Sequence, residues 1–298
     1  MSPGNLIDGR AIAEQIHEET SRRVEALKHR GVEPGLVFVR VGEDPASKVY
    51  VGMKERVGTR LGIRSDTRVL PESTPPDALL SLLGELNDDS RVHGILVQAP
   101  LPRHIDAPRV YSTISPDKDV DGFHPVNAGR LLLGDETGFL PCTPAGVHEL
   151  LVRSGVSIEG AEVVILGRGN IVGKPMASIL IQKAPNANAT VTVCHSRTRN
   201  IADHCRRADI LIAALGSPEF VKADMVKPGA VVIDVGVNRV ADARARGGSR
   251  LVGDVAFDAV RPVAGMITPN PGGVGPMTIA MLMRNTVRAA ENQTEPTT

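Results

Sequence analysis

Short runs of β-branched and other apolar residues alternate along this chain with longer stretches of helical periodicity. Such alternation is typical of parallel α/β architecture, because each helix returns the chain to start the next strand in the same direction. Strands are expected at 36–41, 63–70, 94–98, 162–166, 190–194, 210–213 and 230–235. Helices are expected at 6–30, 47–61, 76–87, 125–133, 144–154, 172–182 and 276–290. With 298 residues, the chain is predicted to form two α/β domains, with a boundary near Gly138–Thr143.

The charge and aromatic content exclude several functions. The chain has 34 basic and 34 acidic residues, two Tyr, five Phe and no Trp. Nucleic-acid and membrane-surface proteins carry a basic excess, and single-strand binders need stacking aromatics. No apolar stretch approaches the ~18 residues that span a bilayer, and no signal peptide is recognisable. We therefore expect neither a nucleic-acid nor a membrane partner, and the polar residues 291–298 are expected to form a frayed tail.

The three cysteines point to a reducing compartment. Cys142, Cys194 and Cys205 form no C-x-x-C pair, and an odd number is poor material for a disulfide framework. Cys194-His195 and His204-Cys205 match no standard zinc spacing. The expectation is a cytoplasmic protein without a bound metal, with structural roles for the cysteines.

A glycine-rich turn follows the expected strand 162–166. Gly167, Gly169 and Gly173 have a Gly-x-Gly-x-x-x-Gly spacing, one residue longer than the commonest dinucleotide fingerprint. Small residues let the backbone approach a pyrophosphate, and the following helix N-terminus supplies N–H donors. A P-loop is excluded because Lys174 precedes Pro175 and not Ser or Thr. By itself the pattern also fits a tight turn without a ligand.

The end of the next strand favours NADP over NAD. An NAD site would place Asp or Glu there for the ribose hydroxyl. The chain instead has the basic and hydroxyl side chains of Cys194–Arg199, and Arg168 lies in the turn itself. These groups suit a 2′-phosphate.

Tyr50 and Lys54 are four residues apart on an expected helix and therefore share one face. Short-chain dehydrogenases use the same spacing, but there the nucleotide turn comes first along the chain, whereas here the pair precedes it. Burial would lower the pKa of Lys54 and let it accept and return a proton. Gln98 could orient the amine, and Asp121 could accept hydrogen bonds from a ligand with adjacent N–H groups. A solvated lysine beside a packed tyrosine is the alternative.

Five segments taken together resemble the bifunctional methylenetetrahydrofolate dehydrogenase/methenyltetrahydrofolate cyclohydrolase family. They are Val41–Lys54, Gly94–Pro102, Pro116–Phe123, Leu166–Pro175 and Pro271–Thr278. The resemblance implies a homodimer with two α/β domains, the second a Rossmann-type parallel sheet that binds NADP, and a folate cleft between them. Residues 1–139, completed by the C-terminal helix 276–298, would form the catalytic domain, and 140–275 the NADP domain.

The resemblance also implies roles for individual residues. Lys54 would be the catalytic lysine and Gln98 its support. The substrate-binding residues would be Tyr50, Asp121, Gly272 and Gly273. The cofactor-binding residues would be Gly167, Arg168, Gly169, Ser196 and Val237.

The implied activity is the NADP-dependent oxidation of 5,10-methylenetetrahydrofolate to the methenyl form, followed by hydrolysis to 10-formyltetrahydrofolate. The chain departs from the family pattern at Gly169, where Ser is common, and at Arg56, Ala99 and Asn270, where Lys, Leu and Val are usual. A shikimate-type NADP dehydrogenase explains the layout but not the segment Pro271–Thr278. A non-catalytic nucleotide-binding protein would not need Lys54, Gln98 and Asp121 together.

Overall fold

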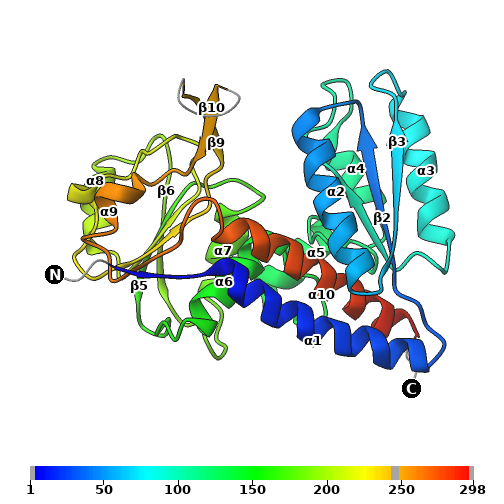
Figure 1. Ribbon diagram of the computed structural model, residues 1–298, viewed down its shortest axis with the longest axis horizontal. Coiled ribbons are helices and arrows are strands. Elements are labelled where there is room, and N and C mark those ends of the chain that lie inside the picture. Colours follow the sequence, from blue (N-terminus) through cyan, green and yellow to red (C-terminus); the bar gives the residue numbers. More distant parts are fainter. Residues whose placement is uncertain (1–3, 243–247, 295–298) are drawn as a thin grey trace. The chain divides into compact units, whose positions relative to one another are not determined.

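A computed structural model describes residues 4–242 and 248–294, and the chain divides into two compact units (Figure 1). The six-stranded unit contains the N-terminal segment up to Ala13 together with Thr143–Thr278. The three-stranded unit contains Glu14–Cys142 and the C-terminal segment from Ile279 onward. The two units are described separately below.

The six-stranded unit has a sheet in which every strand pairs in parallel. Its order across the sheet is β1 (Asn5–Leu6), β11 (Met266–Ile267), β8 (Val231–Asp234), β7 (Ile210–Ala213), β5 (Glu162–Leu166) and β6 (Thr190–Cys194). The strands β5 and β7 are buried apart from the first residue of β5, as expected for a parallel sheet covered on both faces. The chain reverses direction across the sheet at β5, so its topological switch point lies between β5 and β7.

Short helices and a hairpin complete the six-stranded unit. The helical segments are α6 (Cys142–Arg153), α7 (Gly173–Leu180), α8 (Ile201–Arg207), η1 (Ala223–Met225) and α9 (Phe257–Val260). The hairpin pairs β9 (Asn238–Ala241) with β10 (Ser249–Val252) in antiparallel register. Cys194 and Cys205 pack in the apolar core against Leu166 and Leu211.

The three-stranded unit has the parallel order β3 (Arg64–Leu70), β2 (Gly35–Val41) and β4 (Gly94–Val97). Its helices include α2 (Pro45–Arg60), α3 (Pro76–Asp88), α4 (Ala107–Thr113) and α5 (Pro125–Leu133). Leu79 and Leu83, four residues apart on α3, pack with Val37 and Val39, which point to one face of β2. All seven residues of β2 are buried, so this central strand anchors the loops at its ends.

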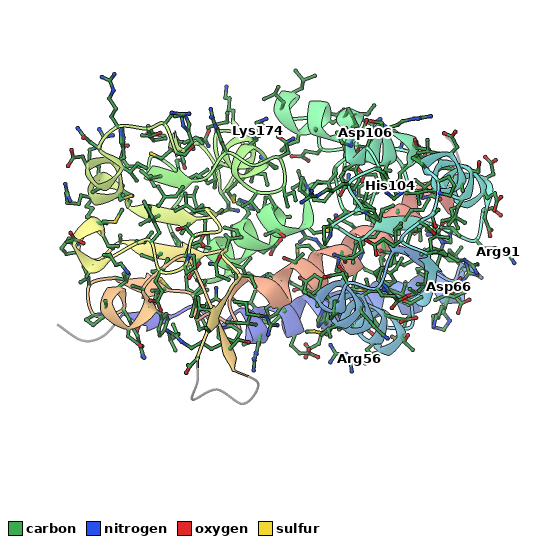
Figure 2. All side chains as sticks on the ribbon, turned by 90° about the horizontal axis from the view of Figure 1, so that it is seen from above. Arg56, Asp66, Arg91, His104, Asp106 and Lys174 are labelled. Atoms are coloured by element: carbon green, nitrogen blue, oxygen red, sulfur yellow. The ribbon has the colours of Figure 1, made fainter. Side chains whose placement is uncertain are left out.

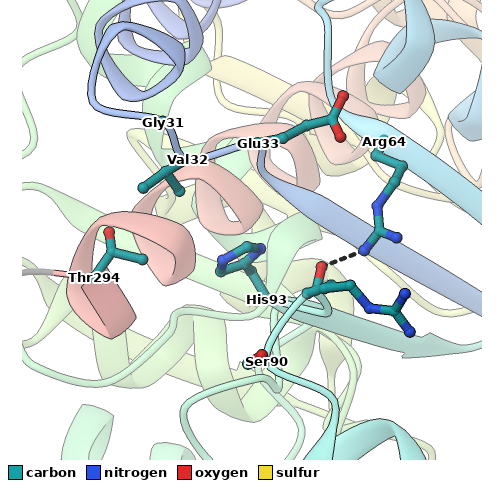
Figure 3. A pocket seen from close by; sticks show the side chains of 8 residues that line it. Gly31, Val32, Glu33, Arg64, Ser90, His93 and Thr294 are labelled. Carbon is teal, nitrogen blue, oxygen red and sulfur yellow. Dashed lines mark hydrogen bonds between the residues drawn. The ribbon is translucent and has the colours of Figure 1, made fainter.

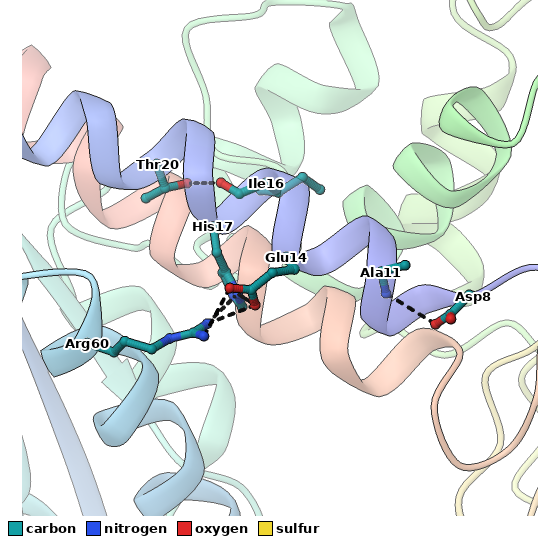
Figure 4. Close-up of polar contacts among 7 residues, drawn as sticks. All are labelled: Asp8, Ala11, Glu14, Ile16, His17, Thr20 and Arg60. Atoms are coloured by element: carbon teal, nitrogen blue, oxygen red, sulfur yellow. Dashed lines mark hydrogen bonds and ion pairs between the residues drawn. The ribbon is translucent and has the colours of Figure 1, made fainter.

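Two long helices, α1 (Gly9–His29) and α10 (Val274–Thr294), each contribute residues to both units. In the three-stranded unit, Arg60 at the end of α2 donates to both carboxylate oxygens of Glu14 on α1, at 3.0 and 3.1 Å (Figure 4). Arg60 also lies 2.9 Å from Nδ1 of His17, and burial lowers the pKa of that imidazole. This cluster ties α2 to α1.

The start of α1 differs from the prediction. A helix was expected from residue 6, but Asn5–Leu6 forms β1 and the helix begins at Gly9. The reason is a cap: Asp8 Oδ1 accepts the backbone N–H groups of Arg10 and Ala11. Figure 4 shows the contact with Ala11. The β1–β11 pairing also groups the N-terminal segment with the six-stranded unit.

The divisions at Cys142/Thr143 and Thr278/Ile279 lie close to the predicted boundaries at 139/140 and 275/276. The N-terminal segment up to Ala13 is the exception, since the prediction placed all of 1–139 in one domain. Residues 295–298 of the expected tail lie outside the described residues, whereas α10 continues regularly to Thr294.

Candidate active site

Lys54 is buried in the three-stranded unit, with 4 % of its surface exposed. Its Nζ donates to Gln98 Oε1 at 3.1 Å and lies 4.7 Å from the centre of the Tyr50 ring. The other end of the Gln98 amide donates to the carbonyl of Ala99 at 2.7 Å, which turns the oxygen toward Lys54. By contrast, the side chain of Arg56 on the same helix is exposed (Figure 2). The predicted Tyr50, Lys54 and Gln98 thus lie together.

The surroundings of Lys54 lower its pKa. Burial is the largest cause, because removal from water disfavours the charged ammonium. The negative charge of Asp121 opposes this shift. Conversely, burial raises the pKa of Asp121, and the nearby Lys54 charge and the Cys142 thiol oppose that rise. A lower pKa increases the neutral fraction of the amine, which is the form that can accept a proton as a general base.

Asp121 lies in a loop held by a second carboxylate. Asp119 accepts the backbone N–H groups of Phe123 and His124 at 3.1 and 2.7 Å, and the side-chain amide of Asn127 at 2.9 Å. Burial nevertheless raises the pKa of Asp119 to about 6. Gly122 has φ +77°, and a Cβ there would lie 2.5 Å from the backbone nitrogen of Pro141, so only glycine fits.

Two residues near Asp121 were missed as site residues. Cys142 is 1 % exposed, and its thiol contacts the Asp121 carboxyl and the carbonyl of Val120. Asn285 on α10 donates to the carbonyls of Val120 and Leu140, at 2.9 and 3.1 Å. Neither residue stands in a recognisable motif, since both act through contacts far apart in sequence.

The glycine-rich turn lies at the carboxyl end of β5, beside the switch point. Gly167 has φ +120°, and a Cβ there would lie 2.1 Å from the carbonyl oxygen of Ala214. A Cβ on Gly173 would lie 2.1 Å from the carbonyl oxygen of Gly167. Both positions therefore require glycine, whereas Gly169 has no neighbouring atom within 4 Å and has room for a side chain. The turn suits a pyrophosphate at the N-terminus of α7.

Other predicted cofactor residues lie at the same carboxyl edge. Arg168 and Ser196 are exposed at the ends of β5 and β6, and Val237 follows β8 with 71 % of its surface exposed. No acidic residue follows β6 directly, where Cys194 is succeeded by His195, Ser196 and Arg197.

Gly272 and Gly273, predicted to bind substrate, lie in the six-stranded unit, whereas Tyr50 and Asp121 lie in the three-stranded unit. Gly273 packs closely on the start of α1, because a Cβ on Gly9 would lie 1.8 Å from its carbonyl oxygen. Gly272 has φ +112°. The positive φ favours glycine at position 272, and a Cβ on Gly273 would lie 2.7 Å from the carbonyl oxygen of Pro269, so close packing favours glycine there.

A cavity of about 340 Å³ lies at the opposite, amino end of the three-stranded sheet (Figure 3). It is lined in part by His93, which precedes β4, and by Arg64, which begins β3. Gly31 and Thr294, at the ends of α1 and α10, also line it. It is separate from the Lys54 group, which lies beyond the carboxyl end of β4.

The described residues contain neither a candidate metal site nor a candidate membrane span. No group of three or more His, Cys, Asp and Glu side chains there could hold a metal ion. None of the helices in that part of the chain combines the length and apolarity needed to cross a bilayer.

A parallel sheet with a glycine-rich turn at its switch point, and a separate unit with a buried lysine, define a nucleotide-binding α/β enzyme. Comparison with known proteins identifies the family. Residues 7–121 match the family model "Tetrahydrofolate dehydrogenase/cyclohydrolase, catalytic domain", and residues 141–294 match the corresponding NAD(P)-binding domain. The chain belongs to the tetrahydrofolate dehydrogenase/cyclohydrolase family.

Relatives match along nearly the whole chain. The bifunctional protein FolD of Syntrophobacter fumaroxidans is 56 % identical over 96 % of this chain and 97 % of its own. The crystal structure of Trypanosoma brucei FolD, complexed with NADP and an inhibitor, is 42 % identical with a TM-score of 0.94, and covers 99 % of this chain and 100 % of its own. The Campylobacter jejuni FolD structure is 47 % identical with a TM-score of 0.91, over 97 % of this chain and 99 % of its own.

This membership confirms the predicted family, the fold of two α/β domains with a nucleotide-binding second domain, and an enzyme with dehydrogenase and cyclohydrolase activities. For the shikimate-type alternative, the comparison shows a likeness of fold and nothing more. A shikimate dehydrogenase from Peptoclostridium difficile is 14 % identical with a TM-score of 0.50, over 88 % of this chain and 92 % of its own.

Proposed function

We propose that the chain oxidises 5,10-methylenetetrahydrofolate to the methenyl form with NADP and then hydrolyses this product to 10-formyltetrahydrofolate. The observation that carries the proposal is the group of Lys54, Tyr50 and Gln98, which lie together in the unit that matches the catalytic-domain model.

The six-stranded unit fits a bound dinucleotide. Gly167 and Gly173 leave the turn without side chains where a pyrophosphate would approach, and the N-terminus of α7 offers backbone N–H groups. When bound, the nicotinamide ring supplies the hydride acceptor. Arg168, Ser196 and the exposed Arg197 favour NADP, because guanidinium groups pair with a 2′-phosphate and no acidic residue follows β6.

The three-stranded unit supplies the groups for the folate. The Tyr50 ring offers a flat face against which a pterin could stack. Asp121 offers two carboxylate oxygens to adjacent N–H groups of the ligand. Gly272 and Gly273, in the six-stranded unit, are proposed to border the bound folate.

Hydride transfer creates a methenyl cation whose charge is shared by two nitrogens, so this step requires positioning more than proton transfer. Hydrolysis is different, because water must lose a proton as it adds and the ring nitrogen must gain one as the ring opens. Both tasks are assigned to Lys54 in this proposal. The support is that its lowered pKa gives a larger neutral fraction and that Gln98 accepts a hydrogen bond from its Nζ.

An absorbance assay with methylenetetrahydrofolate and either nucleotide tests the proposal. Methenyl-folate should form with NADP and then decay to 10-formyl-folate, with a much slower reaction in NAD. A shikimate-type dehydrogenase or a non-catalytic binding protein would form no methenyl-folate. The homodimer stays a prediction from the family resemblance, and the cytoplasmic location stays a prediction from the cysteine content and the segments of the sequence.

A further inference from the structure

Two aspartates buried in the six-stranded unit have no part in the chemistry proposed above. Asp234 ends β8 and is 3 % exposed, and Asp254 follows β10 and is fully buried. Buried carboxylates are costly unless hydrogen bonds satisfy them. Here the partners are N–H groups of loops at the carboxyl edge of the sheet.

Asp254 binds the loop that follows β7. Its Oδ2 accepts the backbone N–H groups of Leu215 and Gly216, at 2.5 and 2.9 Å. Its Oδ1 accepts the backbone N–H of Ser217 at 2.9 Å and the side-chain amide of Asn238 at 2.8 Å. One carboxylate therefore fixes three consecutive residues of one loop and the end of another.

Asp234 fixes the neighbouring segment. Its Oδ1 accepts the backbone N–H groups of Gly236 and Asp254, at 3.0 and 2.9 Å, and its Oδ2 that of Val255 at 3.2 Å. The side-chain amide of Asn270 donates to the carbonyl of Gly236. Gly236 is thus held at both its N–H and its carbonyl.

The exposed Val237 lies between these two anchors. Gly236 before it is bound to Asp234 and Asn270, and Asn238 after it is bound to Asp254. The backbone packs so closely on the two carboxylates that neither neighbouring glycine has room for a side chain. A Cβ on Gly236 would lie 2.3 Å from the Asp254 carboxylate, and one on Gly253 would lie 1.6 Å from Asp234 Oδ2.

The loop that Asp254 holds also contacts the glycine-rich turn at Gly167. The loop held by Asp254 begins after β7, and β5 and β7 flank the switch point where dinucleotides bind in such sheets. Ala214, next to Leu215, packs its carbonyl oxygen against Gly167 so tightly that no Cβ fits. A shift of the Asp254 loop would therefore move the turn as well.

We propose that Asp234, Asp254 and Asn270 are positioning residues for the dinucleotide, which hold the loop 214–217 and the segment around Val237 in the shape that binds it. The proposal rests on the proposed function for the nature of the ligand. Asn270 stands where the family usually has Val, so this chain has a hydrogen bond to Gly236 that valine cannot make.

The test measures the dissociation constant of NADP by calorimetry in Asp254→Asn and Asn270→Val, and the hydrolysis of methenyl-folate without nucleotide. The amide introduced by Asp254→Asn would turn an N–H group toward a backbone N–H, so the dissociation constant should rise at least about tenfold. Asn270→Val removes one neutral hydrogen bond and should raise it about two- to tenfold. Hydrolysis should stay within about twofold of the parent in both variants, since it uses Lys54 in the other unit.

Asp224→Asn is the matched control, because Asp224 is exposed in the same unit, and it should leave the affinity for NADP unchanged. An unchanged dissociation constant in both test variants overturns the proposal, as does equal loss of hydrolysis and NADP affinity. Should Asp254→Asn fail to fold, Asn270→Val decides alone. A parent that binds NADP but forms no methenyl-folate would instead overturn the proposed function.

Discussion

Replacement of Lys54 by Met removes the amine and keeps an unbranched side chain of similar length. In the structure Nζ is the donor to Gln98 Oε1 and lies over the Tyr50 ring, so the substitution deletes the proton carrier while leaving both neighbours in place. Met suits a buried site, and the energetic cost of burying an ammonium disappears. The variant is therefore expected to fold.

The size of the effect follows from the role of the amine. A positioned acid–base group typically contributes about 10²- to 10⁴-fold, or about 3–5 kcal/mol of transition-state stabilisation. The hydrolysis of methenyl-folate should fall by that factor in Lys54→Met. Oxidation of methylene-folate should fall no more, since hydride transfer requires no proton carrier.

The assay follows the absorbance of methenyl-folate in two experiments, its formation with NADP and its decay without. The pH profile gives a second readout. Hydrolysis in the parent should rise with pH as Lys54 deprotonates, through a pKa that burial holds below its usual value, and Lys54→Met should lack this rise. Lys48→Met, at an exposed position of the same helix, is the control. Full hydrolysis in Lys54→Met would refute the assignment.

Four further outcomes are expected. Arg168→Ala should lower kcat/KM with NADP about 10- to 100-fold and leave NAD unaffected, and an unchanged ratio of the two would contradict the 2′-phosphate contact. Gly169→Ser fits the open space there and should lower KM for NADP about two- to tenfold, and a raised KM would show that the space is needed. Burial raises the pKa of Asp119 to about 6, so the protonated carboxyl stabilises the folded state. Its contribution to the free energy of unfolding is complete below about pH 4 and falls by about 3 kcal/mol as the pH rises through 6. Urea unfolding of Asp119→Asn should lack this part of the pH dependence, and parallel plots of unfolding free energy against pH for parent and variant would disprove it. Gly84→Ala, in α3 with no atom near its Cβ, should raise the free energy of unfolding by about 0.5–1 kcal/mol, and a decrease would mean that hidden crowding exists.

The strands and helices with strong periodicity were predictable from the sequence. The bounds Glu162–Leu166, Thr190–Cys194, Ile210–Ala213 and Pro125–Leu133 agree with the expected ranges. The strand β1 was not predictable, because two residues carry no periodicity and their partner β11 lies some 260 positions later in the chain. The short helices α8 and α9 and the hairpin β9–β10 were missed for a similar reason.

Sequence spacing placed Tyr50 and Lys54 on one helix face, and the structure brings Gln98 to the same amine. The sequence pattern did not reveal the roles of Cys142 or Asp254. An aspartate that accepts four N–H groups looks in the sequence like any loop aspartate, since its role depends on which distant backbone segments surround it. Motifs report residues that meet a ligand, and the residues that support them become visible only in three dimensions.

The chain passes between the two units at Ala13/Glu14, Cys142/Thr143 and Thr278/Ile279. Neither unit is therefore one uninterrupted stretch of the gene. A truncation or fusion with one breakpoint can therefore not separate one complete unit from the other, and a breakpoint between Glu14 and Thr278 leaves both units incomplete. Where it falls before Met266, it also separates β1 from β11. The two activities are therefore expected to be inherited together, since a point substitution at a position such as Lys54 can remove one of them while both units stay complete, whereas a single truncation cannot remove one unit alone.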